Sequence, residues 1–421
     1  MGTRELAELL EQASADVGAP ALAEAAWARA GRVRRRRRIL TGAAAVVAVC
    51  AVTVGVAVPL RGGPRPHPAA TPTSGPAPSA APLGPPRVDQ MPQQPGRRTI
   101  GPLPATGAAF RPAEARMLSQ RPVRRAVAVV EPGSAENATR PEPLYVLDTD
   151  GSWARVDVVD LAFTRDSGNN TADPLRPTAV SPDRRLVAVA QTDEVVVVDV
   201  TTAAVYRTPL PGFNEQVMWR SDDTVLVTRD AGEQATATFA VDWRARTATR
   251  VAAGLSVWNT VVSRPDGPVL ELRGTLGGEA GDEPLVLKEW QLDRAAPVRE
   301  VPVDGRALAP YGVDEWYGPA LRNGPDAAGD LVVRAGWGRT PAYQGIEVVA
   351  VVDVRTGVLQ RLLDLGRDRW KGCCQPLDWV DERTVLLRTE REGLVAWDVS
   401  TGAVSVVSAG QLPGTVAIAL R

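Results

Sequence analysis

The fold is decided by the segment SPDRRLVAVA at residues 181–190, which is followed closely by EVVVVDVTT at residues 194–202. Short Val-rich runs are bounded by Pro, Asp and Thr, a pattern typical of short strands joined by tight turns. The same layout returns as TVLLRTE, GLVAWDV and AVSVVS between residues 384 and 408. The sequence therefore predicts an all-β region after the first quarter of the chain.

This pattern is an internal repeat, in which an apolar strand ends in Asp just before a turn. The repeated positions lie 43 to 60 residues apart and are Asp148, Asp199, Asp242, Asp293, Asp353 and Asp398. An Asp side chain at such a place accepts a hydrogen bond from the backbone two residues on. Repeats of this length with about four strands each match β-propeller blades. Residues 113–421 are therefore predicted to form a propeller of six blades, or seven, closed by residues 415–420 pairing into the first blade.

The repeat SPDRRLVAVA…VVVVDVTT resembles the WD40-like and TolB-type propeller blades of bacterial envelope proteins. Trp397-Asp398 is similar to the WD dipeptide of such repeats. The resemblance implies the fold, a place in the cell envelope and protein binding; it does not imply a mechanism.

Residues 39–60 contain no charged residue, and about 20 such residues span a bilayer as a helix. A cluster of arginines precedes this segment, which by the positive-inside rule keeps the N-terminus in the cytoplasm. The cluster comprises Arg32, Arg34, Arg35, Arg36, Arg37 and Arg38. We expect a single-pass anchor with an extracytoplasmic C-terminal domain. A cleaved secretory signal, a twin-Arg signal and a lipoprotein site at Cys50 stay open as alternatives.

The first 38 residues are expected to be a cytoplasmic helical segment with one apolar face, formed by Leu6, Leu9, Leu10 and Val17. This face either binds a cytoplasmic partner or serves as a spacer at the membrane surface. The layout resembles high-GC bacterial membrane proteins that accompany extracytoplasmic-function sigma factors, which implies a regulator of that type as partner. The His and Cys set of zinc anti-sigma domains is missing.

Residues 61–112 are rich in proline and are predicted to be a disordered linker, because such segments favour extended, unpaired backbone. Residues 113–421 hold 34 basic and 43 acidic residues, a net charge of −9. An acidic domain gives no electrostatic reason to bind nucleic acid.

The search for chemistry predicts no catalytic residue, no metal ligand set and no cofactor, since the single His, His67, lies in the linker. The polar loop from Asp166 to Asp173 was weighed as a Ca²⁺ site and is not an EF-hand. The acidic pairs Asp222/Asp223 and Asp381/Glu382 are interpreted as turns before they are interpreted as a glycosidase pair.

Cys373 and Cys374 are the two cysteines outside the apolar segment, and they are candidates for a vicinal disulfide. Adjacent Cα atoms lie closer than in an ordinary disulfide, so such a bond is expected to be easily reduced.

The function predicted is a membrane-tethered binding or sensing propeller that takes an envelope protein or a small ligand, and that is regulatory through its N-terminus. Two alternatives stay open, an envelope hydrolase or lyase and a structural envelope-assembly factor.

Overall fold

The computed structural model describes residues 86–420, apart from residues 105–107, 134–138, 166–170, 231–236, 256–259, 263–267, 274–284 and 324–329. The chain divides into two units, Met1–Ser79 and Ala80–Arg421. The first unit lies outside the described residues, together with the predicted helical face, the arginine cluster and the predicted membrane segment 39–60. Within the described part of the chain, no helix is long and apolar enough to span a bilayer.

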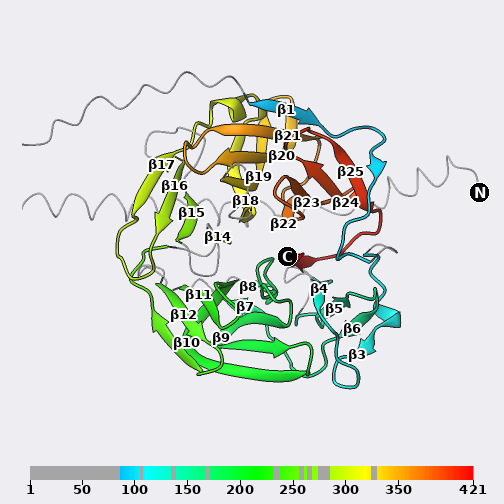
Figure 1. Ribbon diagram of the computed structural model, residues 1–421, viewed down its shortest axis with the longest axis vertical. Coiled ribbons are helices and arrows are strands. Elements are labelled where there is room, and N and C mark those ends of the chain that lie inside the picture. The colour runs from blue at the N-terminus through cyan, green and yellow to red at the C-terminus, as the bar shows by residue number, and fades with distance from the viewer. Residues whose placement is uncertain are drawn as a thin grey trace, which may run out of the picture. The chain divides into compact units, whose positions relative to one another are not determined.

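The second unit is an all-β propeller whose sheets stand around a common centre (Figure 1). One sheet joins the two ends of the unit in the order β26 (Thr415–Ile418), β4 (Ala126–Glu131), β5 (Tyr145–Asp148), β6 (Trp153–Arg155) and β3 (Arg116–Met117). The strand β26 runs antiparallel to β4, with Thr415 opposite Glu131 and Ile418 opposite Ala128. The predicted closing strand is thereby confirmed, and closure of this kind removes an exposed sheet edge.

Two further sheets follow along the chain. The next sheet holds β9 (Leu186–Asp199), β10 (Ala204–Trp219), β11 (Thr224–Asp230), β12 (Ala237–Asp242) and β13 (Thr247–Arg250). A nine-stranded sheet has the order β1 (Arg87–Gln90), β21 (Leu359–Arg367), β20 (Tyr343–Asp353), β19 (Leu331–Thr340), β18 (Val313–Arg322), β14 (Thr260–Val262), β15 (Val269–Arg273), β16 (Val286–Trp290) and β17 (Arg299–Pro302).

The remaining elements complete the ring. One sheet contains β2 (Gly96–Arg97), β25 (Val404–Ser408), β24 (Gly393–Asp398), β23 (Thr384–Thr389) and β22 (Gln375–Trp379). A two-stranded sheet pairs β7 (Thr164–Arg165) with β8 (Thr171–Ala172). Two short 3₁₀ helices are η1 (Pro112–Glu114) and η3 (Arg306–Tyr311).

The described strands thus form five sheets, a five-blade arrangement, and the prediction of six or seven blades was wrong. The reason is that neighbouring repeats share hydrogen bonds. The strand β10 pairs with β9 through its first half and with β11 through its second half, so two repeats lie in one sheet. Likewise β14 pairs in parallel with β18 and merges the repeats that contain Asp293 and Asp353.

The turn chemistry of the repeats was predicted correctly. The Asp199 carboxylate accepts a hydrogen bond from the Thr201 amide at 2.8 Å, and Asp398 accepts one from the Ser400 amide at 2.8 Å. Asp242 and Asp353 accept the same bond from the residue two positions on, at 2.9 Å each. These aspartates are structural because they satisfy turn amides that would otherwise lack a partner.

Residues 86–104, here called the strap, correct the predicted linker boundary. The strap was assigned to the disordered segment 61–112, yet its strand β1 pairs in parallel with β21 and its strand β2 pairs in parallel with β25. Ile100 and Leu103 of the strap are buried in an apolar cluster. The propeller unit therefore begins before residue 113, because strand pairing and apolar burial outweigh the local proline content.

One carboxylate fixes the strap to two sheets. Both Asp89 oxygens lie 2.9 Å from Nη1 of Arg361 on β21, and Asp89 also accepts a hydrogen bond from the Trp397 indole at 2.9 Å. The Asp89 and Arg361 side chains are both largely buried. The Trp of the WD-like dipeptide thus holds the strap, and its Asp forms a turn.

Candidate functional site

The candidate site is the connection between β21 and β22, residues 368–374, here called the disulfide loop. The structure joins Cys373 and Cys374 by a disulfide, and their side chains are 2% and 0% exposed. They pack in an apolar cluster with Val349, Leu363 and Trp379. The loop is therefore anchored in the core between two sheets, and the buried sulfurs are shielded from attack by a solvent thiol.

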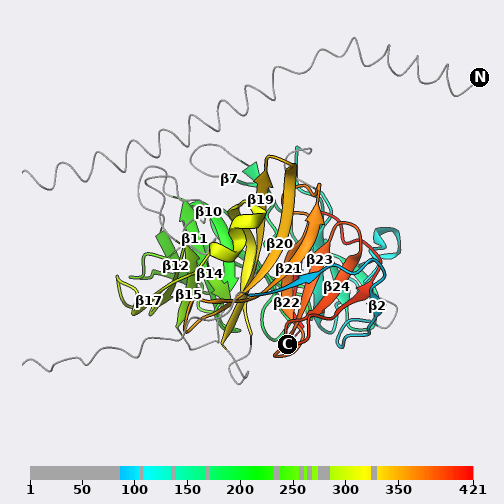
Figure 2. The same cartoon turned by 90° about the horizontal axis from the view of Figure 1, so that it is seen from above.

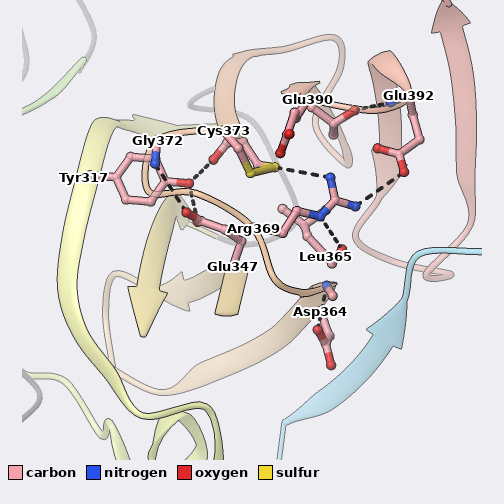
Figure 3. Close-up of a disulfide and its surroundings, with 12 residues drawn as sticks. Tyr317, Glu347, Asp364, Leu365, Arg369, Gly372, Cys373, Glu390 and Glu392 are labelled. Atoms are coloured by element: carbon pink, nitrogen blue, oxygen red, sulfur yellow. Dashed lines mark hydrogen bonds and ion pairs between the residues drawn. A yellow bond between two sulfur atoms is a disulfide. The ribbon is translucent and has the colours of Figure 1, made fainter. Parts of the chain in front are cut away.

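Arg369 ties the disulfide to the neighbouring sheet, as Figure 3 shows. Its Nε donates to the Leu365 carbonyl at 3.1 Å, and its Nη2 lies 3.4 Å from the Glu392 carboxylate. The remaining nitrogen, Nη1, lies 3.8 Å from Sγ of Cys374. A buried guanidinium requires such partners, because an unpaired charge in the interior costs several kcal/mol.

Tyr317 and Glu347 support the other side of the loop (Figure 3). The Tyr317 hydroxyl contacts both Oε2 of Glu347 and the carbonyl oxygen of Cys374. The Gly372 amide donates to Oε1 of Glu347 at 3.3 Å. These four groups link β18 and β20 to the backbone of the loop.

The protons in this contact chain can be counted. A hydroxyl has one proton to donate, and a carbonyl oxygen only accepts. If Tyr317 donates to the Cys374 carbonyl, the Tyr317 oxygen is left to accept a proton from Glu347. Every contact is then satisfied only when the Glu347 carboxyl is protonated.

The electrostatics agree with this count. Burial raises the pKa of Glu347 from 4.5 to about 8, against the opposing effects of the Tyr317 and Gly372 hydrogen bonds and of the charges on Arg369 and Lys371. Burial, followed by the neighbouring Glu347, raises the pKa of Tyr317 well above its usual value. Both groups are therefore neutral at pH 7, and the acid beneath the loop carries no charge.

A second buried acid lies in another sheet and resembles the first. The Glu131 carboxylate, at the end of β4, accepts a hydrogen bond from the Leu175 amide at 2.9 Å. Burial raises the pKa of Glu131 to about 8. The nearby Arg176 side chain is buried, and burial lowers its pKa. This acid does not contact the disulfide loop, so it provides a comparison for Glu347.

Above the disulfide, exposed aromatic and cationic residues gather on one surface, here called the Trp370 face. It consists of Arg339, Tyr343, Arg367, Trp370 and Lys371. Trp370 is 59% exposed and Tyr343 is 41% exposed. The Arg367 guanidinium lies 5.6 Å from the Tyr343 ring centre and 5.5 Å from the Tyr311 ring centre. The Asp368 amide donates to the Gly345 carbonyl at 2.9 Å, which fixes the disulfide loop beside β20. Figure 2 shows β20 and β21 side by side.

The acidic pairs from the sequence are turns. Asp222 accepts a hydrogen bond from the Asp183 amide at 3.0 Å, and Asp223 lies 2.8 Å from Arg244. Asp381 accepts from the Arg383 and Thr384 amides. None of these contacts orients two carboxyl groups at a common centre, as a glycosidase requires.

The proposed Ca²⁺ loop falls partly outside the described residues, since 166–170 are not described. Asp173 is described, and its carboxylate lies 3.4 Å from the Thr415 hydroxyl. Among the described residues, no group of three or more His, Cys, Asp or Glu side chains is arranged to hold a metal ion.

Tyr317, Glu347 and Arg369 were missed by sequence reasoning. Tyr317 and Glu347 lie 57 and 27 residues before Cys374 and sit in apolar strand patterns where nothing distinguishes them. Arg369 precedes the cysteines closely, and its position beside them was the one available signal.

No family model matches the chain, and no curated protein matches its sequence. Three solved structures are similar to parts of it. A eukaryotic initiation factor has 10% identity over 66% of this chain and 61% of its own, with a TM-score of 0.29. TolB from Acinetobacter baumannii has 14% identity over 66% and 62%, with a TM-score of 0.42. An oligogalacturonate lyase in complex with manganese has 12% identity over 74% and 83%, with a TM-score of 0.41. The chain thus spans less than two thirds of the first two of these proteins.

Proposed function

We propose that this chain is a membrane-tethered binding module. Residues 39–60 anchor it, the propeller lies outside the cytoplasm, and the Trp370 face binds an envelope partner. The observation that carries the proposal is the exposed Trp370 on a loop fixed by a buried disulfide, a buried arginine and a neutral buried acid. A large aromatic side chain held out on a rigid support loses little entropy when it binds.

The strap gives the tether a fixed point of attachment. Because β1 pairs with β21, the chain that leads to the membrane leaves the propeller beside the strand that ends at the disulfide loop. A partner bound at the Trp370 face would thus be held at a defined place relative to the tether. In this proposal the face formed by Leu6, Leu9, Leu10 and Val17 binds a cytoplasmic regulator of the sigma-factor type.

The membrane part is tested with the full chain in sealed vesicles. Protease added outside should digest only one side of the membrane, and a protected fragment containing residues 1–38 or the propeller should survive according to orientation. Complete digestion, or release of the chain by high salt without detergent, would overturn the anchor.

The binding part is tested by crosslinking the full chain in cells of its source, with a photoreactive residue at position 370 and a matched one at Arg244 on another sheet. A specific envelope protein crosslinked from position 370 alone supports the proposal. Equal crosslinking from both positions contradicts a binding role for this face, and turnover of wall polysaccharide by the purified chain would favour the envelope hydrolase.

A further inference from the structure

We propose that the Trp370 face takes an acidic segment of a protein partner, an inference that rests on the proposed binding function. The face combines Trp370 and Tyr343 with Arg339 and Arg367. Trp, Tyr and Arg are the residue types that carry most of the binding energy at protein interfaces. Each aromatic ring offers a large contact area with few rotatable bonds, so binding fixes little side-chain freedom.

Charge selects the partner. The face holds the cations Arg339, Arg367 and Lys371, and its acids are Asp364, 2.8 Å from Arg367, and the exposed Asp368. The buried Glu347 adds no negative charge, because its pKa of about 8 keeps it protonated at neutral pH. The local balance is therefore positive on a region whose net charge is −9.

The charge of Arg369 does not reach this surface. Its guanidinium is buried and paired with Glu392 at 3.4 Å. The positive charge that a partner meets is thus carried by the side chains around the exposed rings. Such an arrangement attracts carboxylates and suppresses cationic partners, because complementary charges steer encounter and like charges oppose it.

Aromatic and cationic groups also contact each other here, which keeps the face ordered before binding. Arg367 lies between the Tyr311 and Tyr343 rings, and the Arg339 guanidinium lies 5.1 Å from the Trp337 ring centre. Guanidinium groups stacked on rings keep their N–H edges directed outward, where they accept carboxylates in a bidentate manner. The face is therefore built to bind acidic side chains beside an apolar anchor.

The test uses the full chain in lipid nanodiscs and a synthetic 15-residue peptide that alternates Glu with Leu and Gly. A second peptide replaces every Glu by Lys. Biolayer interferometry should show binding of the acidic peptide alone, weakened at least tenfold by Trp370→Ala and by Arg339→Ser. The Arg244→Ser variant is the matched control, since Arg244 also lies over a Trp ring, Trp243, at 4.7 Å, but in another sheet. This variant should bind within twofold of the native chain.

Several outcomes overturn the inference. Equal binding of both peptides, or acidic-peptide binding unchanged by Trp370→Ala and Arg339→Ser, would remove the face as an acidic-segment site. Binding of polygalacturonate or of phosphatidylglycerol vesicles through these residues, without the peptide, would replace the protein partner by another class. All variants should keep the native melting temperature, because the substituted side chains are exposed. If crosslinking from position 370 still captures an envelope protein while the acidic peptide fails, the binding function stands and only its charge selectivity is wrong.

Discussion

The strap and the disulfide loop meet neighbouring parts of β21, but they are held in opposite ways. The strap is held by a charged pair, Asp89 with Arg361, and by parallel strand pairing. The loop is held by a covalent bond, by a paired arginine and by the carboxyl of Glu347, which is neutral at pH 7. One attachment depends on two charges remaining ionised, and the other depends on an acid remaining protonated.

This difference separates the two attachments experimentally. A change that neutralises Asp89 should loosen the strap and leave the loop intact, whereas a rise in pH through 8 should act on the loop and leave the strap intact. The tether and the binding face can thus be perturbed independently, although both contact β21.

The largest effect is expected from Asp89→Ala. This change leaves the Arg361 guanidinium buried without its carboxylate and removes the acceptor of the Trp397 indole. Breaking a buried pair by removal of one partner costs about 3–5 kcal/mol. Denaturant unfolding of the full chain, followed by Trp fluorescence, measures the loss.

The double variant Asp89→Ala/Arg361→Met is the control, because it removes both charges and should recover most of the stability. A loss below about 1 kcal/mol for Asp89→Ala alone, comparable with an exposed ion pair, would mean that the strap is not fixed by this contact.

A smaller, pH-dependent effect is expected from Glu347→Gln. The folded-state pKa of Glu347 is raised from 4.5 to about 8, so its carboxyl favours folding below pH 4.5 and loses that contribution progressively up to pH 8. Each pKa unit corresponds to about 1.4 kcal/mol. Glutamine can still donate to Tyr317 and accept from Gly372, and it does not ionise. The variant should therefore match the native chain near pH 5 and exceed its stability above pH 8.

Glu131→Gln is the matched control, because that acid has a pKa of about 8 as well but lies away from the loop. It should change the pH dependence of unfolding in the same direction. Only Glu347→Gln should abolish a pH-dependent change in the fluorescence of the exposed Trp370. If both variants abolish that change, or if neither does, Glu347 does not control the disulfide loop.

The sequence predicted what is local and missed what is distant. The turn aspartates such as Asp199 and Asp398 were recognised because each bonds an amide two residues away. The blade number was missed because the pairing of β14 with β18, and the continuity of β10 across two repeats, depend on hydrogen bonds between repeats that spacing does not specify. The strap was missed since its partners, Arg361 and Trp397, lie more than 270 residues away in the chain.

The candidate site divides in the same manner. Cys373 and Cys374 were noticed because they are adjacent and because cysteines are scarce. The groups that give the loop its chemistry, Tyr317 and Glu347, come from two other strands and read as ordinary strand residues. Burial, which shifts the pKa of Glu347, is a property of the packed sheets, and so the neutral acid could not have been predicted from the pattern.

The smallest effect is expected from the covalent bond itself, in the double variant Cys373→Ser/Cys374→Ser. The bonded residues are neighbours in sequence, so the disulfide closes almost no chain and removes little entropy from the unfolded state, which by the loop-entropy relation amounts to about 1 kcal/mol. The loop would still be held by Arg369 and by the Tyr317–Glu347 contacts. Denaturant unfolding, compared with the native chain with and without dithiothreitol, measures the loss, and the native chain should resist reduction until it unfolds because both sulfurs are buried. A loss as large as that of Asp89→Ala would show that the covalent bond, more than the buried polar contacts, holds the loop, and the contrast between the two attachments would then be one of covalent against ionic bonding.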